Sequence, residues 1–433
     1  MNNASNPTQP TTTIEKVQRT LGKRRRAEKR FQAYGIASIL FGLLCLVVLF
    51  GDIFSKGVSA FYQHSVRLTV QFDPQLLDIT DVNDEQQRRL ANYDAMVREA
   101  LLQRFPDVSG RSARREVTAL VSSSAGYELR DALQHDHSLL GKQGTYWFNV
   151  DDDVDSYLKL RSDDNETFSG RLSENQQQWI KSLLEDGEIK KHFNTTFFTA
   201  SDSREPEQAG ILGAAIGSLL TLLVCLVLSF PVGVAAAIYL EEYAQKNRLT
   251  DFIEVNINNL AAVPSIIFGL LGLAIFINLF GIPRSVPLVG GLVLSLMTLP
   301  TIIIASRAAV KAVPPSIREA ALGIGASKMQ VILHHILPLA MPGMLTGTII
   351  GMARALGESA PLLMIGMVAF IVDLPAGIFD PATALPVQIY LWADSPERAF
   401  VERTSAAIIV LLTFLFLMNG LAVWMRKRLE RRW

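Results

Sequence analysis

Residues 317–343 of the 433-residue chain have the sequence IREAALGIGASKMQVILHHILPLAMPG, and this stretch decides the fold. Its charged and polar residues lie between two long apolar segments. The triplet Glu-Ala-Ala at 319–321 is followed by a helix breaker at Gly325 and by Pro338, which does not continue a helix. The spacing predicts two short helices separated by a glycine turn. Such a compact surface is suited to docking a partner that delivers force; the alternative is an ordinary cytoplasmic loop.

Six apolar blocks reach the length of about 20 residues that a bilayer requires of a helix. The first follows Lys23–Arg26 and has the layout of a secretory signal, but its apolar core is longer than a signal's and no small-residue cleavage site follows. We therefore predict a mainly α-helical membrane protein with a retained first anchor. The predicted spans are residues 33–54, 210–239, 257–280, 286–306, 343–372 and 404–425.

The distribution of basic residues predicts the orientation of these spans. Residues 1–32 hold eight basic residues against two acidic ones, and residues 426–433 hold five against one. Because basic segments stay in the cytoplasm, both tails and the loop containing Glu319 are predicted to be cytoplasmic. Residues 240–256 are an exception, with two basic and four acidic residues.

Residues 55–207 form a predicted soluble insert on the outer side, between the first two spans. They hold 18 basic and 26 acidic residues, a net charge of −8 with histidines neutral, and are long enough to bury a core. Alternation from Val66 to Phe72 predicts a strand with one buried face. Helical spacing occurs at 84–105, 114–134 and 173–185, so we predict an α+β domain.

An acidic run in the insert resembles the start of a calcium-binding loop. Asp151, Asp153 and Asp155 alternate as the first ligands of such a loop do. Ser156 stands where the loop needs glycine, and Ser162 stands where it needs glutamate. We therefore predict a solvated acidic turn and no metal site.

Two charges interrupt the apolar blocks after the first span, Arg354 and Glu358. If the fifth helix begins near Gly343, Arg354 lies roughly 17 Å along it, near the middle of a hydrocarbon core of about 30 Å. A charge at that depth normally faces a cavity or a partner. We predict that Arg354 contacts or guides an oxyanion and that Glu358, four residues on, tunes it. The alternative is an ion pair that only fixes helix packing.

The same block carries a stripe of small residues at intervals of four: Gly343, Gly347, Gly351 and Ala355. Such a stripe allows two helices to approach closely, so we predict a packed, central helix and assign the stripe no other role. Pro361 is expected to interrupt this helix above Glu358.

Several kinds of site are absent from the sequence. There is no GxxxxGK[ST] phosphate loop, so the chain by itself does not hydrolyse ATP in that manner. No Ser/His/Asp, zinc or nucleotide-fold signature occurs, and a formal net charge of zero gives no argument for nucleic acid. Cys45 and Cys225 lie in apolar blocks and provide neither a disulfide framework nor a CxxC site. We predict a non-catalytic subunit without a cofactor, in which His135, His137, His334 and His335 lie on the surface.

The segment at 311–342 resembles the EAA loop of binding-protein-dependent ABC importer permeases. The residues that carry the resemblance are Glu319, Ala320, Ala321, Gly325, Leu337 and Pro338. His335 departs from the pattern, which usually has isoleucine there. The resemblance implies six transmembrane helices of the type I ABC importer permease fold and a loop that docks an ATPase.

Three longer stretches, 258–273, 298–328 and 353–363, resemble the PstA family of phosphate permeases. The resemblance covers residues 208–425, half of the chain, as an ABC transmembrane permease domain. The insert departs from the shortest members, which join the first two spans almost directly, and is similar to that of a long-form subgroup.

This resemblance implies a phosphate importer in the bacterial inner membrane. A PstC-like second permease would complete a heterodimer, two PstB-like ATPases would power it, and a periplasmic phosphate-binding protein would deliver the ion. Another oxyanion, sulfate or molybdate, is the alternative cargo. A membrane sensor is a third hypothesis, disfavoured by a C-terminal tail of only eight residues.

Overall fold

The computed structural model describes residues 13–81, 83–162, 171–368 and 370–429, and the chain divides after Ser55 into two units. The first unit contains most of helix α1 (Thr13–Ser59), which is long and apolar enough to cross a membrane from Leu21 onward. The apolar side chains of this stretch are exposed, as in a helix that faces lipid or another subunit. The anchor predicted at 33–54 is therefore helical, but the helix already begins within the basic tail.

In the second unit, a small antiparallel sheet forms the centre of the insert, with strand order β2-β1-β3. Its strands are β1 (Tyr62–Gln71), β2 (Gln143–Asn149) and β3 (Ile189–Phe193). Val66, Leu68 and Val70 of β1 are buried, which confirms the strand predicted from their alternation.

Short helices cover this sheet and complete a core of its own, formed by residues between Val66 and Leu183. The predicted helix at 84–105 is divided in two, because Asn92 accepts a bond from the N–H of Ala95 and starts a new helix there. The α+β class is confirmed. The helical elements are α2 (Pro74–Leu77), α3 (Glu85–Leu90), α4 (Tyr93–Arg104), α5 (Arg111–Thr118), α6 (Ser124–His135), η1 (His137–Leu139), α7 (Asp152–Ser162), α8 (Glu174–Glu185), α9 (Thr195–Thr199) and η2 (Pro206–Gln208).

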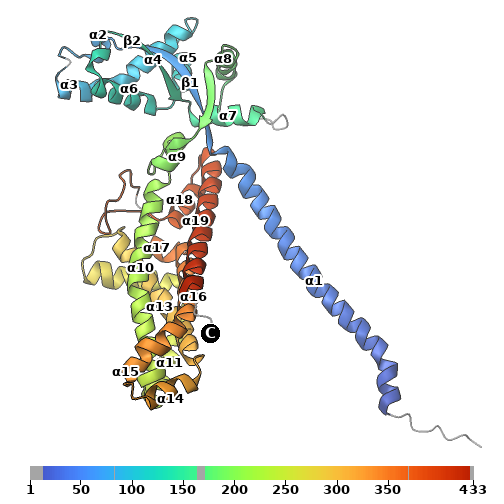
Figure 1. Ribbon diagram of the computed structural model, residues 1–433. Helices are drawn as coiled ribbons and strands as arrows, with labels where there is room; N and C mark the ends of the chain where they lie inside the picture. The colour runs from blue at the N-terminus through green and yellow to red at the C-terminus, as the bar shows by residue number, and fades with distance from the viewer. Residues whose placement is uncertain (1–12, 82, 163–170, 369, 430–433) are drawn as a thin grey trace, which may run out of the picture. The chain divides into compact units, whose positions relative to one another are not determined.

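The rest of the second unit is helical, and its long helices run between the insert and a group of short helices at the opposite end (Figure 1). Among the described residues of the whole chain, five helices are long and apolar enough to cross a membrane, or six if one bent pair counts as a span. The elements are α10 (Leu212–Ile238), η3 (Tyr239–Tyr243), α11 (Arg248–Ala261), α12 (Ser265–Gly272), η4 (Leu273–Leu279), α13 (Pro287–Lys311), α14 (Pro315–Gly323), α15 (Lys328–Val331), η5 (Ile332–Ile336), α16 (Leu337–Gly357), α17 (Ala360–Met364), α18 (Leu385–Ala393) and α19 (Ala399–Leu429).

Two of the predicted spans are wrong in their limits. The third, expected as one helix over 257–280, consists of two helical segments that meet at 101°. Pro264 stands at the break with an extended ψ of 136°, and it has no N–H group with which to continue α11. The fifth, expected over 343–372, ends at Gly357.

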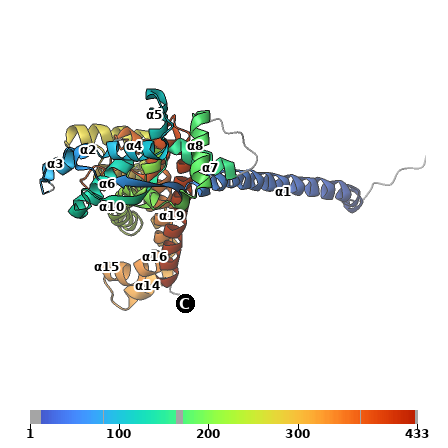
Figure 2. The ribbon, with the colours of Figure 1, turned by 90° about the horizontal axis from the view of Figure 1, so that it is seen from above.

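Helix α13 packs between α10 and α16, and the stripe of small residues makes its contact with α16 possible. A Cβ atom added to Gly347 would lie only 2.2 Å from the Cβ of Ala305, and one added to Gly343 would lie 2.6 Å from that of Ala309. The close helix approach predicted from the stripe is confirmed. At one end of α16, the short helices α14 and α15 lie beside it (Figure 2).

Candidate functional site

The segment predicted to dock a partner begins with α14, which starts at two prolines. Pro314 caps this helix and Pro315 occupies its first position, where the N–H group that proline lacks is not needed. Ala321 is buried in an apolar cluster with residues of α13, η5 and α16, whereas Glu319 and Ala320 are exposed. The Glu-Ala-Ala triplet therefore contributes one residue to packing and two to the outer surface.

The turn after α14 requires its glycine. Gly325 has a φ of +89°, a left-handed conformation that residues with a side chain rarely adopt. Its N–H donates to the carbonyl of Leu322 at 2.9 Å, and the next N–H donates to Ala321 at 3.1 Å, which closes the end of the helix. A capping box at Ser327 then starts α15. The predicted glycine turn is confirmed.

The second predicted helix does not stop at Pro338. α15 continues through the π-helical turn η5 into α16, so that one helical segment runs from Lys328 to Gly357. A proline lacks one helical hydrogen bond, and its ring crowds the carbonyl four residues earlier. The wider turn just before Pro338 accommodates both effects. The docking segment is therefore joined to a membrane span without an intervening loop.

Arg318 holds α14 against the neighbouring helix ends. Its Nε and Nη2 atoms donate to Glu242 Oε1 at 3.0 and 2.9 Å, and Nη1 donates to the carbonyl of Val313 at 2.6 Å. Nη2 also donates to the carbonyl of Val310 at 2.9 Å. The guanidinium group thus binds α14 both to the end of α13 and to η3.

Arg307 makes a second set of ion pairs at the same end of the molecule, with Glu241 at 2.8 Å and Glu254 at 2.6 Å. Together with Glu242, these acids account for three of the four acidic residues in the exceptional segment 240–256. Sequence reasoning did not find the pairs, because the partners lie 53 to 76 residues apart along the chain.

Apolar side chains remain exposed around the triplet. Ile324 is 84% exposed and Met329 57%, although both belong to residue types that are usually buried. Exposed apolar groups of this kind are typical of surfaces that bind a partner. We call it the coupling surface, and it consists of Glu319, Ala320, Leu322, Ile324 and Met329. The predicted surface positions of His334 and His335, beside it, are confirmed.

The predicted pathway charges lie at the end of α16 and not in its middle. Arg354 is in the last turn of α16. Glu358 is the C-cap residue that follows, and its ψ of 118° is extended, so the helix ends there. The helix start assumed near Gly343 is wrong, because the helical segment begins at Lys328 and ends at Gly357, and the depth of Arg354 in the bilayer stays a prediction. Arg354 Nε lies 3.5 Å from Glu358 Oε1, and the two side chains are 50% and 21% exposed. The pair forms as predicted, but it uses only one edge of the guanidinium group.

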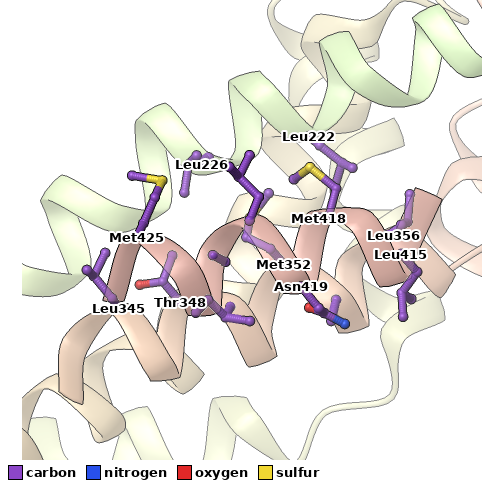
Figure 3. Close-up of a pocket in the computed structure, with 14 residues that line it drawn as sticks. Leu222, Leu226, Leu345, Thr348, Met352, Leu356, Leu415, Met418, Asn419 and Met425 are labelled. Carbon is purple, nitrogen blue, oxygen red and sulfur yellow. The ribbon is translucent and has the colours of Figure 1, made fainter. Parts of the chain in front are cut away.

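An apolar cavity of about 220 Å³ lies between α10, α16 and α19 (Figure 3). Leucine and methionine side chains from all three helices line it, together with the polar side chains of Thr348 and Asn419. Arg354 and Glu358 are not among its lining residues. Because apolar walls do not replace the hydration of an anion, this cavity is not a binding site for a charged cargo.

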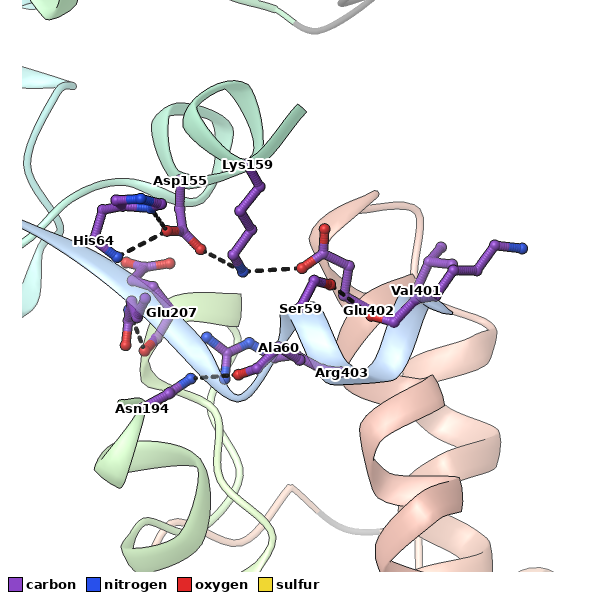
Figure 4. Close-up of polar contacts among 12 residues, drawn as sticks. Ser59, Ala60, His64, Asp155, Lys159, Asn194, Glu207, Val401, Glu402 and Arg403 are labelled. Atoms are coloured by element: carbon purple, nitrogen blue, oxygen red, sulfur yellow. Dashed lines mark hydrogen bonds and ion pairs between the residues drawn. The ribbon is translucent and has the colours of Figure 1, made fainter. Parts of the chain in front are cut away.

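A network of charged side chains links the insert to the start of α19 (Figure 4). Lys159 Nζ lies 2.7 Å from Asp155 Oδ2 and 3.0 Å from Glu402 Oε2. Asp155 Oδ1 lies 2.9 Å from His64 Nδ1. Burial raises the pKa of Asp155, but the bonds from His64 and Lys159 outweigh it and hold the pKa below its usual value. The insert is thus fastened to the permease region through α7.

Sequence reasoning missed Arg403, which lies one residue before the span predicted at 404–425. Its side chain is buried, and Nη1 donates to the carbonyl of Ala209 at 2.9 Å. A basic residue next to an apolar block was a visible signal, but only the fold shows that this one faces protein.

The predicted solvated acidic turn is only partly present. Asp155 is buried and paired, so the prediction is wrong for that residue. The carboxylates of Asp151, Asp152 and Asp153 lie within 4.8 Å of one another. Burial, followed by the charges of Asp152 and Glu207, raises the pKa of Asp151 to about 8. At neutral pH this carboxyl therefore keeps its proton, which lowers the repulsion among the three. The predicted surface positions of His135 and His137 are confirmed.

Two family models match separate parts of the chain. Residues 229–432 match the binding-protein-dependent transport system inner membrane component, and residues 18–167 match a domain of unknown function, DUF3333. A family model separate from that of the permease region therefore covers most of α1 and most of the insert.

Relatives match about half of this chain. The probable ABC transporter permease protein YqgI of Bacillus subtilis (strain 168) is 29% identical over 53% of this chain and 82% of its own length. The phosphate transport system permease protein PstA 1 of Mycobacterium tuberculosis (strain CDC 1551 / Oshkosh) is 33% identical over 52% of this chain and 74% of its own. A solved structure of the MetNI methionine ABC transporter in an inward-facing conformation shares 19% identity over 51% of this chain and 95% of its own, with a TM-score of 0.41.

Proposed function

The chain belongs to the family of binding-protein-dependent transport system inner membrane components, and from this membership we propose that it is the PstA-like subunit of an importer for inorganic phosphate. The general function, a permease subunit of a binding-protein-dependent ABC importer in the inner membrane, is that of the family. The specific cargo is the proposal, and the similarity to a phosphate permease carries it.

The coupling surface supports a separate ATPase as the source of energy. Its exposed apolar side chains and Glu319 offer a partner both contact area and charge. When the ATPase pair closes on ATP, it displaces α14 and α15, and the helical segment from Lys328 to Gly357 carries this displacement into the membrane region. Hydrolysis then resets the subunit, as in other two-state machines.

Arg354 and Glu358 are the proposed contacts with the cargo. They stand at the far end of the helical segment that begins at the coupling surface, so that a shift of this segment moves them directly. A half-exposed guanidinium group has donors in a planar arrangement that suits a tetrahedral oxyanion. Glu358 holds this group in place before the ion arrives. A second, PstC-like permease subunit supplies the remaining groups.

The arrangement of the second unit supports an assignment of sides. The insert and the coupling surface lie at opposite ends of it (Figure 1). We place both chain termini and the coupling surface in the cytoplasm and residues 55–207 in the periplasm, where a phosphate-binding protein delivers the ion.

Uptake of radiolabelled phosphate tests the cargo. The chain is reconstituted into lipid vesicles with its second permease and its ATPase, and each unlabelled anion is added as a competitor. ATP-dependent uptake should be inhibited by phosphate and left unchanged by sulfate or molybdate. Equal or stronger inhibition by sulfate or molybdate would transfer the assignment to that oxyanion and leave the permease function in place.

A further inference from the structure

Four arginines of the insert line one open hollow of about 600 Å³. Arg98 comes from α4, and Arg111, Arg114 and Arg115 come from α5. Leu102, Gly110 and Thr118 complete the lining, and no carboxylate occurs among the described residues that form it. We call this region the arginine hollow. Its charge is opposite to that of the insert as a whole, which has a net charge of −8.

The backbones that carry these arginines are held in place by the core of the insert. Val97 and Leu101 of α4 are buried, and so is Val117 of α5. The side chains of the four arginines are exposed above this packed layer. Their positions are therefore set by the fold, while their donors remain open to water and to solutes.

The start of α5 adds to the positive potential. Gly110 precedes the helix with a φ of +94°, no side chain caps the first N–H groups, and the first turn holds no acidic residue. The partial positive charge at a helix start favours acids there and disfavours arginine. Arg111 and Arg114 therefore occupy positions that the helix dipole disfavours, an arrangement that a bound anion would relieve.

Other arginines of the insert have partners in the fold. Arg104 is paired with Asp186 and Glu188, and Arg130 is paired with Asp131. Within the part of the chain that the structure describes, the four arginines of the hollow have no carboxylate within 4.0 Å. Four guanidinium groups without a carboxylate partner among the described residues thus line a single hollow.

We propose that the arginine hollow binds a phosphate-type oxyanion on the outer side of the membrane. A tetrahedral oxyanion accepts paired hydrogen bonds from guanidinium groups and further bonds from the free N–H groups of a helix start. Free phosphate and the phosphate group of a lipid both present this chemistry. The proposal stands independently of the cargo, because the hollow belongs to the insert and not to the permease region.

Binding of phosphate to the purified full chain tests the proposal. The chain carries Arg354→Gln throughout, so that the proposed pathway contact does not contribute. Equilibrium dialysis with labelled phosphate compares this chain with one that also carries Arg111→Ser and Arg114→Ser. The matched control carries Arg89→Ser and Arg130→Ser, which remove the same charge from the same domain.

The hollow variant should lose at least tenfold in phosphate affinity, and the control should lose less than twofold. Competition by a soluble short-chain phosphatidic acid, with the matching phosphatidylcholine as a control, separates a lipid headgroup from free phosphate. Stronger competition by phosphatidic acid than by phosphate assigns the hollow to headgroups.

Two results would overturn the proposal. One is equal phosphate affinity in the hollow and control variants. The other is the absence of measurable phosphate binding by the chain whose hollow is intact. Thermal melting of each variant verifies that the chain is folded, and the uptake experiment reports separately on the permease function.

Discussion

Arg318 and Arg354 are connected by one stretch of helices, yet they differ in how many partners the fold gives them. Arg318 makes four hydrogen bonds to a carboxylate and two carbonyls, and its side chain is 23% exposed. Arg354 is 50% exposed and has one contact with Glu358 at 3.5 Å. An arginine whose donors are all used holds the fold together, whereas one with open donors is available to a ligand.

The largest effect is expected where the donors are saturated. Arg318→Ala removes all four hydrogen bonds and leaves Glu242, which is 11% exposed, without its cation. An unpaired, partly buried carboxylate costs about 1–3 kcal/mol. We expect α14 to detach, phosphate uptake to fall at least tenfold, and the ATPase to be lost on co-purification. Arg318→Lys, which keeps the charge, should retain part of both. Normal uptake with the ATPase bound would remove Arg318 from the coupling role.

A nearly equal loss of phosphate uptake is expected when Arg354 is replaced, but its cause is different. Arg354→Gln should lower phosphate uptake about tenfold while the complex stays assembled, because few contacts of the fold are lost. Arg354→Lys keeps the charge without the planar set of donors and should fall between the two. Uptake at the level of the unmodified protein, at equal expression, would show that this pair serves only packing.

A smaller effect is expected at Gly347, which lies on the helix that carries Arg354. In Gly347→Val the new Cβ would lie 2.2 Å from that of Ala305, so α16 must move away from α13. Overpacking of this kind costs about 1–3 kcal/mol. We expect a lower melting temperature and weaker coupling of ATP hydrolysis to uptake. Gly357→Ala is the matched control, since nothing lies within 4 Å of a Cβ atom at that position. Similar melting of both variants would contradict the close contact.

The smallest effect is expected at an acidic residue, Asp151, and it extends the comparison of partnered and unpartnered charges from arginines to acids. Glu242 has an arginine partner, whereas burial, followed by the charges of acidic neighbours, raises the pKa of Asp151 to about 8 from the ordinary 3.8. The folded protein therefore holds a proton that the unfolded chain has already released, and stability falls as the pH rises from about 4 to about 8. Asp151→Asn removes this loss.

Melting curves at several pH values measure this loss of stability. The melting temperature of Asp151→Asn should exceed that of the unmodified protein by a few degrees at pH 8 and by less at pH 5. Asp78→Asn is a suitable control, because this residue is exposed and its φ of +54° is one that asparagine adopts readily. A difference that does not change with pH would contradict the raised pKa.

Local patterns predicted most of the fold. The alternation around Val66 indicated β1, Gly325 indicated the turn in the docking segment, and the small-residue stripe indicated that α16 packs closely against another helix. Each of these depends on backbone sterics or on the period of a helix or strand, which neighbouring residues reveal.

Helix limits were the weaker part of the prediction. Pro338 was expected to stop a helix, and a π turn allows the helix to pass through it. Pro264 was expected to lie in a single span and instead separates two segments. The local rule for proline states what is lost in a helix, but neighbouring packing decides whether the chain breaks, bends or widens.

The sequence by itself determined that this protein is helical, has the apolar lengths of a membrane protein and carries an α+β insert, since apolar length and periodicity are local properties; the permease family followed from the resemblance of longer stretches. Only the tertiary structure decided which charges are partnered. Glu242 and Glu254 pair with arginines 76 and 53 residues away along the chain. Asp155 pairs with Lys159 one helix turn away and contacts the ring of His64, 91 residues away. The same holds for the arginines at 98, 111, 114 and 115, which in the described part of the chain line one hollow and have no carboxylate within 4.0 Å. Electrostatic partners are set by distances in space, and those distances follow from packing.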